Sequence, residues 1–347
     1  MFKLKQIPED FVVKELMNLK PKKDGKFAYF VLKKRNWTTL KALQVIAEKL
    51  GLRLRMFGWA GNKDKRAITE QICSVKGIGK ERLEKVGARL LGQGIELTFL
   101  GRGKKPISLG SNVGNRFEIV VRGIDSMPEI KKYFVNFFGE QRFRGDGLEI
   151  GRAILHQEWA KAAELAAKKY PAVKQRLKEV PSDPIGALKQ VHLKLLKFFV
   201  ASYQSWLWNE MAKEYLRQAQ DIEPEAVLPI IGFDTSEEPL VKNILKRESL
   251  TTKDFIIKQF PELSCEGSTR KVWIEAQGLV VQGPKPDELN PGKKKLQLNF
   301  DLPKGSYATE FIRQLFNNKF YRYSENSLTT EQSSLKTSSI APEASTS

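Results

Sequence analysis

The sequence GNKDKRAITEQ at Gly61–Gln71 follows a short apolar segment and contains one acid, Asp64, among cations that include Lys65 and Arg66. Opposite charges this close keep a carboxyl group ionised, so Asp64 is available as a nucleophile or as a base at neutral pH. The same cations would attract a polyanion. A solvated, charged loop between two strands would have a similar sequence, and the rest of the chain has to decide between these two interpretations.

The chain of 347 residues carries a formal net charge of +19. An excess of this size favours association with a polyanion, either a nucleic acid or an anionic membrane surface. No segment concentrates its cations opposite one apolar face, as a helix lying on a membrane would. The cations instead form short clusters typical of a broad phosphate-binding face, such as residues 20–26, 33–35, 102–105 and 293–295. We therefore expect a nucleic acid partner and no membrane.

The cysteine and histidine content predicts neither a disulfide framework nor a metal site. The two cysteines, Cys73 and Cys265, fit a reducing cytoplasm, and the two histidines are isolated from one another. No group of these residues has the spacing of a zinc site. The first residues lack the apolar core of a signal peptide, and the most apolar stretch, residues 193–208, is too interrupted to span a bilayer. We expect a cytoplasmic protein without a metal.

The first 140 residues alternate between strand and helix patterns. A helix is expected after the N-cap candidate Thr38, ending at Gly51, because its apolar positions follow a helical period. A second helix is expected over residues 80–91 and a third over 128–138. Strands are expected near residues 7–15, 26–33, 68–75, 95–100 and 116–122. This succession predicts an α+β fold whose mixed sheet carries helices on one side.

The pattern changes after about residue 151. Up to about residue 269 strands are scarce, and helices are expected over residues 160–169 and 193–217. Strand patterns return at 270–281 and 294–301, followed by a last helix over 307–316. Residues after about 323 are rich in Ser, Thr and Glu and have almost no large apolar groups, which predicts disorder.

A second candidate site lies at Val135–Phe143, where amides, aromatic rings and Arg142 follow one another. Amides can recognise the Watson–Crick edge of a base, and an aromatic ring can stack on its face. The rings of Phe137 and Phe143 suit a buried core equally well, and the segment alone leaves both interpretations open.

Two other motifs are better explained without a ligand. The aromatic residues within 198–208 recur at helical spacing, which favours a helix core over a stacking platform. The sequence Gly77–Lys80 lacks the spacer and the Ser or Thr of a nucleotide-binding P-loop, so a turn from strand to helix is expected there.

Taken together, several blocks of this sequence resemble the TruD family of tRNA pseudouridine synthases. The similarity covers most of residues 5–320 in the order found in the family. Its blocks are Pro8–Val13 with Glu15, Gly61–Gln71, Ser108–Gly110 with Gly114–Phe117, Asn136–Phe143 and Leu302–Ala308. One departure is Arg144-Gly145-Asp146, where the family usually has glycine directly after the last phenylalanine of the block.

The resemblance implies a pseudouridine-synthase-like catalytic domain of the α+β class. Its mixed, mainly antiparallel sheet would be flanked by helices and interrupted by a mostly helical insertion domain. We expect residues 1–150 and 270–322 to form the two parts of the catalytic domain. Residues 151–269 would form the insertion, and residues 323–347 a disordered tail.

The resemblance also implies that the protein isomerises a uridine of tRNA, typically at position 13, by base flipping and with no cofactor. Asp64 stands at the position of the essential aspartate, and Lys5 lines up with a lysine that the family places near it. We expect Phe138 to stack on the flipped base and Asn136 to orient that base or the Asp64 loop. Phosphate contacts are expected from Lys65, Arg66 and Arg142.

Two other classes of protein compete with this hypothesis. A non-catalytic RNA-binding protein or RNA chaperone would have the same charge but would not need Asp64. A nuclease usually needs a cluster of metal-binding carboxylates or paired histidines, and Asp64 has no partner acid nearby in sequence. We expect the protein to be a monomer.

Overall fold

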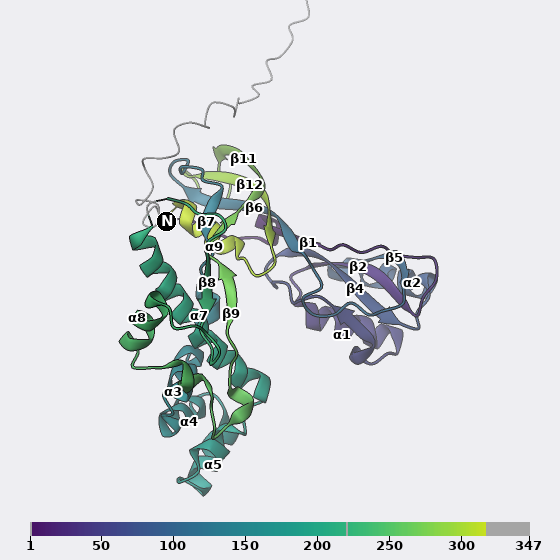
Figure 1. Cartoon of the computed structure of the whole chain (residues 1–347). Helices are drawn as coiled ribbons and strands as arrows, with labels where there is room; N and C mark the ends of the chain where they lie inside the picture. Colours follow the sequence, from purple (N-terminus) through teal and green to yellow (C-terminus); the bar gives the residue numbers. More distant parts are fainter. Residues whose placement is uncertain (1, 220, 317–347) are drawn as a thin grey trace, which may run out of the picture. The chain divides into compact units, whose positions relative to one another are not determined.

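The computed structural model describes residues 2–219 and 221–316, so the tail expected at 323–347 lies outside the described residues. The chain divides into two compact units (Figure 1). The first unit combines Met1–Asn136 with Ile274–Phe316, and the second is formed by Phe137–Trp273.

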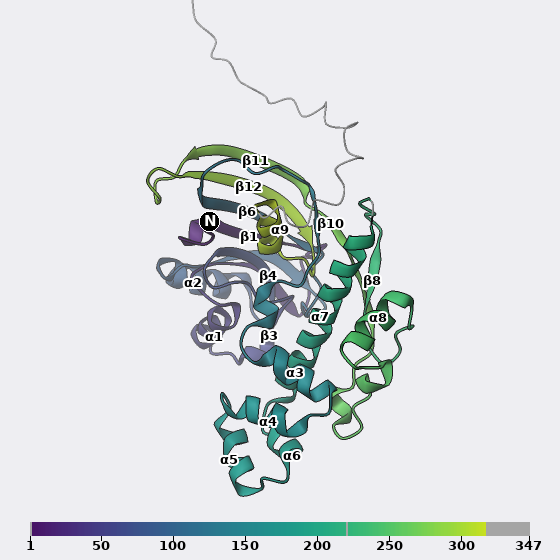
Figure 2. The same cartoon turned by 90° about the vertical axis from the view of Figure 1, so that its left-hand side faces the viewer.

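The first unit is built on an eight-stranded sheet (Figure 2). The strand order is β11-β12-β6-β1-β4-β2-β5, and β3 pairs with β4. Its strands are β1 (Phe11–Leu16), β2 (Phe27–Arg35), β3 (Phe57–Trp59), β4 (Ile68–Lys76), β5 (Ile95–Gly103), β6 (Gly114–Ile124), β11 (Gln277–Pro286) and β12 (Lys294–Pro303). The pair β1–β4 is parallel and the other pairs in this sheet are antiparallel. The expected mixed, mainly antiparallel sheet is confirmed.

Helices cover one face of this sheet, as expected. In the strand register Val13 lies opposite Phe117 on one side and Thr69 on the other, and Phe30 lies opposite Cys73. Because directly paired residues point to the same face, these side chains share one side of the sheet. On that side α1 (Thr39–Leu50) and α2 (Lys80–Leu90) pack over β2 and β4, and α9 (Ala308–Phe316) packs over β6 and β12.

The first of these helices has the ends that its sequence predicts. The Thr38 hydroxyl accepts a hydrogen bond from the Lys41 N–H at 3.3 Å, and Gly51 ends α1 in the left-handed conformation with φ 64°. A hydroxyl at the N-cap satisfies a backbone donor that the helix itself leaves unpaired. Glycine adopts the left-handed conformation without steric penalty.

The prediction of a helix over residues 128–138 is wrong. This segment contains the short strand β7 (Tyr133–Val135), which pairs with β10 (Trp273–Glu275). The Gln314 side chain accepts a hydrogen bond from the Val135 N–H at 2.9 Å and donates one to the Val135 carbonyl at 2.8 Å. Because the backbone groups find partners outside the segment, an extended conformation can be buried here without a helix.

The second unit is mostly helical. Its α-helices are α3 (Gly147–Leu155), α4 (Trp159–Ala167), α5 (Pro171–Glu179), α6 (Pro184–Leu188), α7 (Leu193–Gln218) and α8 (Pro239–Arg247), and β8 (Val227–Ile230) pairs with β9 (Ser268–Lys271). Short 3₁₀ turns in the two units cover Pro8–Asp10, Leu54–Met56, Leu91–Gln93, Glu140–Phe143, Thr252–Phe255 and Pro261–Leu263. Among the described residues, no helix is both long enough and apolar enough to cross a membrane.

The long helix α7 supplies much of the core of this second unit. Tyr203 and Trp208 are buried, which confirms that the aromatic run is mainly core, although Phe198 is 39% exposed. Helix α3 packs directly on α7, and a Cβ atom at Gly151 would overlap the carbonyl oxygen of Phe199. A glycine is therefore required at this crossing.

Candidate active site

Asp64 lies in the loop of residues 60–67, which joins β3 to β4 at one end of the sheet in the first unit. Its side chain is 45% exposed, and one carboxylate oxygen, Oδ2, lies 2.5 Å from the Nζ of Lys5. The Lys5 side chain is only 16% exposed, and its Nζ also lies 4.0 Å from the centre of the Phe11 ring. The structure therefore brings Lys5 and Asp64 into contact, although 59 residues separate them in sequence.

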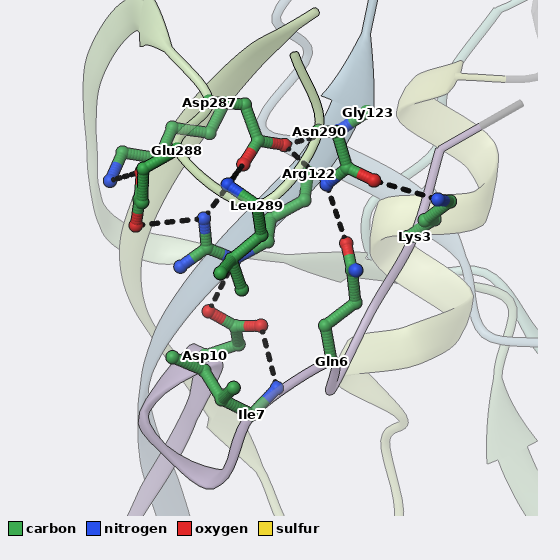
Figure 3. A network of polar contacts seen from close by, with 11 residues as sticks. Lys3, Gln6, Ile7, Asp10, Arg122, Gly123, Asp287, Glu288, Leu289 and Asn290 are labelled. Atoms are coloured by element: carbon green, nitrogen blue, oxygen red, sulfur yellow. Dashed lines mark hydrogen bonds and ion pairs between the residues drawn. The ribbon is translucent and has the colours of Figure 1, made fainter.

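The segment that carries Lys5 is fixed by a network of polar contacts (Figure 3). Lys3 forms two backbone hydrogen bonds with Arg122 of β6, at 2.8 and 3.0 Å, and its Nζ donates to the Asn290 side chain. The Asn290 amide in turn donates to Gln6 at 2.7 Å. Lys5 thus lies between two anchored residues, which limits the positions that its side chain can reach.

Arg122 is the centre of this network, and its side chain is 4% exposed. It donates to Asp10 at 2.8 Å and to Asp287 at 2.9 Å. Burial alone would raise the pKa of Asp287. Hydrogen bonds from the Gly123 and Leu289 N–H groups, Asn290 and Arg122 outweigh that effect and lower this pKa to about 2. Asp287 is therefore a carboxylate at neutral pH and holds Arg122 and the 287–290 turn together.

A buried lysine of β2 binds the backbone of the Asp64 loop. Lys34 is 1% exposed, and its Nζ donates to the carbonyl oxygens of Trp37 at 2.6 Å, Asp64 at 2.8 Å and Lys63 at 3.4 Å. Burial lowers the pKa of Lys34 to about 8, although the nearby charge of Asp64 acts in the opposite direction. The ammonium group is thus fully used in binding backbone oxygens of the loop.

The remaining loop contacts come from α1 and β4. The buried Thr39 hydroxyl accepts from the Lys63 N–H at 2.9 Å and donates to the Gln71 side chain at 2.7 Å. The Gln71 amide donates to the Gly61 carbonyl at 3.0 Å. Because these partners belong to regular elements, the loop backbone is positioned by the sheet and by the first turn of α1.

The cations beside Asp64 in sequence have different surroundings. Lys63 is turned toward the buried Glu15 of β1, with 2.8 Å between Nζ and Oε1, and the other oxygen of Glu15 accepts from the Ile72 N–H. Lys65 and Arg66 are exposed and have no ion-pair partner among the described residues. Lys65 and Arg66 therefore remain available to bind a phosphate near Asp64, whereas Lys63 is held by Glu15.

Of the other predicted site residues, Asn136 belongs to the first unit, and Phe138 and Arg142 belong to the second. Asn136 is buried at the end of β7 in the first unit. In the second unit, Asn209 of α7 holds the backbone of Phe138 with two hydrogen bonds, at 2.9 and 3.0 Å. The rings of Phe138 and Trp208 form a T-shaped pair, and the guanidinium carbon of Arg270 lies 4.0 Å from the centre of the Phe138 ring.

Arg142 lies near the same ring. Its guanidinium carbon is 4.8 Å from the ring centre of Phe198 and 5.9 Å from that of Phe138, and its Nε donates to the Ser205 hydroxyl. Such cation–π contacts attract the guanidinium group to the ring face and so help to orient it. The structure therefore groups Phe138 and Arg142 in the second unit, while Asp64, Lys5, Lys65 and Arg66 lie in the first.

A comparison with protein-family models matches almost the whole chain. The model for tRNA pseudouridine synthase D (TruD) matches residues 2–175, 168–231 and 217–315. The chain belongs to the TruD family. The tRNA pseudouridine synthase D of Aquifex aeolicus (strain VF5) is 30% identical, with 90% of this chain and 98% of that protein covered.

Two other relatives match this chain over a similar share of its length. A Methanosarcina acetivorans protein assigned as tRNA pseudouridine synthase D is 29% identical over 90% of this chain and 92% of its own. A crystal structure from Methanosarcina mazei, assigned likewise, superposes with a TM-score of 0.74 at 28% identity and covers 90% of this chain. The fold described above is therefore the TruD fold.

Three of the sequence blocks that resemble the TruD family meet around the Asp64 loop. Glu15 of the first block pairs with Lys63, as described above. Gly110 of another block donates its N–H to the Ala60 carbonyl at 2.8 Å, and the Gly110 carbonyl accepts from the Nζ of Lys304. The blocks are far apart in sequence but share one structural task, which is to fix this loop.

Metal binding and thiol chemistry can be examined for the part of this TruD-family chain that the structure describes. Within the described residues, no three His, Cys, Asp or Glu side chains are grouped so that they could hold a metal ion. Burial raises the pKa of the Cys73 thiol strongly, and it raises that of Cys265 to about 12. Both thiols therefore stay protonated at neutral pH.

Lys34 and Asn209 were missed by the sequence analysis, and so was Arg270. Lys34 was counted among surface cations at residues 33–35. Its alternation with Phe30 and Leu32, which share the helix-covered face, was the signal that places it inward. Asn209 and Arg270 carry no comparable signal, because their contacts join segments that are distant in sequence.

Proposed function

We propose that this protein is a tRNA pseudouridine synthase that isomerises a uridine of tRNA, at position 13, to pseudouridine. The observation that carries the proposal is the half-exposed carboxylate of Asp64 paired with Lys5 on a loop whose backbone is fixed from several sides. Membership of the TruD family and the names of its relatives support the tRNA substrate.

The reaction breaks the N1–C1′ bond of uridine, rotates the uracil and rejoins it to the sugar through C5. C5 then loses its proton, and N1 gains one. The product has the same atoms as the substrate, so the balance of the reaction requires no external oxidant or reductant. Asp64 acts as a nucleophile toward the base or the sugar, or as a base that removes the C2′ proton. Lys5 holds the carboxylate in place during either step.

The target uridine has to leave its stack to reach Asp64, at a cost of a few kcal/mol. We assign to Phe138 the stacking that compensates part of this cost, and to Asn136 the orientation of the base or of the loop. Arg270 and Trp208 hold the ring of Phe138 in a defined orientation. Lys65, Arg66 and Arg142 would contact phosphates on either side of the everted nucleotide.

We further propose that the second unit contains the insertion domain of the family, at about residues 151–269. Its helical content and its place between the two chain segments of the first unit support this assignment. Residues 1–150 and 270–322 would then supply the catalytic domain.

The test is incubation with unmodified tRNA followed by detection of pseudouridine, with wild type compared with Asp64→Ala and Asp64→Asn. Both variants should lose the activity and keep their affinity for tRNA. Glu48→Ala is a matched control, because Glu48 is also an exposed acid next to a lysine but lies near the end of α1, away from the loop. Replacing uridine 13 of the tRNA by cytidine should remove the product from wild-type reactions.

Measurable turnover by Asp64→Ala would refute the assignment of Asp64. A non-catalytic RNA-binding protein is the alternative that the net charge of +19 also fits. In that case wild type would bind tRNA and form no pseudouridine, and Asp64→Ala would behave like wild type in every assay.

A further inference from the structure

Three basic segments lie side by side at one end of the sheet in the first unit. Phe27 begins β2, and its neighbours across the sheet are Lys76 at the end of β4 and Gly103 at the end of β5. The loop before β2 touches both of these strand ends. Lys22 exchanges two backbone hydrogen bonds with Arg102, each of 2.8 Å, and the Gly77 N–H donates to the Lys26 carbonyl at 3.1 Å.

These segments, residues 20–26, 76–80 and 102–105, are named the distal basic surface. They contain nine lysines and arginines and one acid, Asp24. Eight of the nine cations are exposed, namely Lys20, Lys22, Lys23, Lys26, Lys76, Lys80, Lys104 and Lys105. Within the described part of the chain, Lys80 has a weak ion pair with Glu84 at 3.9 Å, and the other seven have none. Like charges this close repel one another, and a bound polyanion would relieve that repulsion.

The distal basic surface lies at the opposite end of β2 from Asp64. Lys34, near the far end of this strand, donates to the carbonyl oxygen of Asp64. From Phe27 to Lys34 the strand advances seven residues, which at about 3.3 Å each corresponds to roughly 23 Å. A nucleotide that reaches Asp64 therefore cannot itself contact the distal basic surface, whereas an RNA helix attached to that nucleotide can.

We propose that the distal basic surface binds the phosphate backbone of an RNA duplex that lies several base pairs from the target uridine. The inference rests on the proposed function for the identity of that RNA, which is the tRNA substrate. Recognition would follow the shape and charge of the duplex and not its base sequence. The enzyme would thus bind tightly only those uridines that are attached to a helix at the correct distance.

The composition of the surface favours RNA over a membrane. None of the exposed large apolar side chains of the described chain belongs to residues 20–26, 76–80 or 102–105. A protein segment that lies on a bilayer inserts apolar side chains beside its cations. A surface that offers cations alone is suited to a phosphate backbone, whose binding is mainly electrostatic.

The experiment replaces Lys22, Lys23, Lys104 and Lys105 together by glutamine. None of these side chains donates a hydrogen bond that the structure records, and none belongs to the Asp64 loop. Binding is measured with full-length unmodified tRNA and with a short RNA that has the target uridine and three nucleotides on each side. The Kd for tRNA should rise at least about tenfold, and the slope of log K against log salt should become shallower by about 3. The Kd for the short RNA and the kcat at saturating tRNA should stay within about twofold.

A matched control removes the same charge elsewhere in the same unit, by replacing Lys41, Lys49, Arg53 and Arg55 with glutamine. These exposed residues belong to α1 and the segment that follows it. The control should change the Kd for tRNA by less than about threefold. The proposal would be overturned if both variants lost the same affinity for tRNA. It would also be overturned if the distal variant lost the same affinity for tRNA and for the short RNA. Capture by anionic phosphatidylserine vesicles that the four substitutions abolish while leaving tRNA binding intact would overturn it as well.

Binding is measured in the Asp64→Ala background as well, so that no turnover is needed to read the result. If wild type forms no pseudouridine but the distal variant alone loses affinity for tRNA, the proposed function fails and the distal basic surface stands. If wild type forms pseudouridine and the distal variant binds tRNA like wild type, the surface assignment fails and the function stands.

Discussion

The ammonium group of Lys5 and the carboxylate of Asp64 form the ion pair on which the proposed chemistry depends. Lys5→Met keeps most of the side-chain volume against Phe11 and removes the charge. A charge-assisted hydrogen bond is worth about 1.5–3 kcal/mol, so we expect the single-turnover rate to fall about 10- to 150-fold. Stability should change by less than about 1 kcal/mol, because Asp64 is half exposed.

The control for this change is Lys5→Arg, which keeps the charge and should recover part of the rate. Single-turnover kinetics and urea denaturation give the two quantities separately. An unchanged rate in Lys5→Met would show that the ion pair does not support the reaction.

Lys34 should make stability depend on pH in the alkaline range. Its pKa is about 8 in the folded protein and 10.5 in the unfolded chain. Between these values the unfolded state binds more protons than the folded state, so the contribution of Lys34 to stability rises with pH. Over this pH range the free energy of unfolding should rise by roughly 3 kcal/mol in total. Below pH 8 the buried charge opposes folding by its full amount, and this contribution no longer varies with pH.

The measurement compares the free energy of unfolding of wild type and Lys34→Met from pH 6 to 10.5. The difference, wild type minus variant, should stay constant up to about pH 7 and rise above pH 8. Lys33→Met is the control, because Lys33 precedes Lys34 in β2, points to the opposite face and has only a partly exposed ion pair, with Glu96 at 3.2 Å. Parallel curves for wild type and Lys34→Met would contradict the role of Lys34. Loss of activity in Lys34→Met at neutral pH would agree with its three bonds to carbonyl oxygens near Asp64.

Truncation of Phe138 should slow the reaction. Stacking of a base on an aromatic ring is worth about 1–3 kcal/mol, so Phe138→Ala should reduce the rate about 5- to 150-fold. Phe198→Ala is the control, because it removes the other aromatic ring near the Arg142 guanidinium and is not assigned to the base. We expect its rate to stay within about threefold of wild type. If the two variants were equally slow, the slower rate would reflect a general effect on Arg142 and not the loss of stacking on Phe138.

The sequence predicted which residue types surround Asp64 but not what each one does. Lys63 and Lys65 look equivalent in sequence, yet Lys63 pairs with Glu15 and Lys65 stays exposed. The difference arises because Glu15 belongs to β1, which pairs with β4 directly after the loop. The direction of a side chain depends on such pairings, which a local pattern does not contain.

At the scale of elements, Arg122 of β6 connects the N-terminal segment with the turn between β11 and β12 (Figure 3). Arg122→Met would leave two buried carboxylates, Asp10 and Asp287, without their shared cation. Breaking a buried ion pair in this way typically destabilises a protein by about 3–5 kcal/mol. We expect the free energy of unfolding, measured by urea denaturation at pH 7, to fall by this amount.

The same network predicts sensitivity to acid. The pKa of Asp287 is about 2 in the folded protein, below its ordinary value of 3.8. Stability from Asp287 is therefore fully present above about pH 4 and is lost as pH falls toward 2, by roughly 2 kcal/mol. Asp287→Asn should be less stable than wild type at pH 7 and should lose less than wild type between pH 4 and 2. A constant difference between the two proteins over that range would contradict this account.

Elements whose pattern is local were predicted well, and elements that depend on distant partners were not. Helix α1 has both of its end signals, Thr38 and Gly51, within its own sequence. The strand at Tyr133–Val135 has none, because its hydrogen bonds come from Gln314 of α9 and its pairing from β10. The α+β class and the one-sided arrangement of helices followed from the order of the elements. The parallel pairing of β1 with β4 did not, because register is set by tertiary contacts.

At the scale of the whole molecule, the net charge of +19 is the property that most directly concerns RNA. Each phosphate that is neutralised releases counterions, and log K for a nucleic acid falls with log salt by about 0.7–0.9 per contact. The exposed cations near Asp64 and the distal basic surface together offer more than five such contacts. The slope for tRNA should therefore be steeper than about −3.

The rate of the chemical step should not follow the same dependence. Salt screens exposed charges, but Lys34, Thr39 and Gln71 hold the Asp64 loop through buried, short-range hydrogen bonds. At saturating tRNA we therefore expect kcat to change less than about twofold between 50 and 200 mM salt, while Kd rises steeply. The measurement is a titration of tRNA at each salt concentration, with pseudouridine formation and binding followed in parallel. A flat salt response of Kd would show that the cations of this protein do not bind the substrate, whereas a kcat that falls together with the affinity would show that the loop depends on screened surface charges.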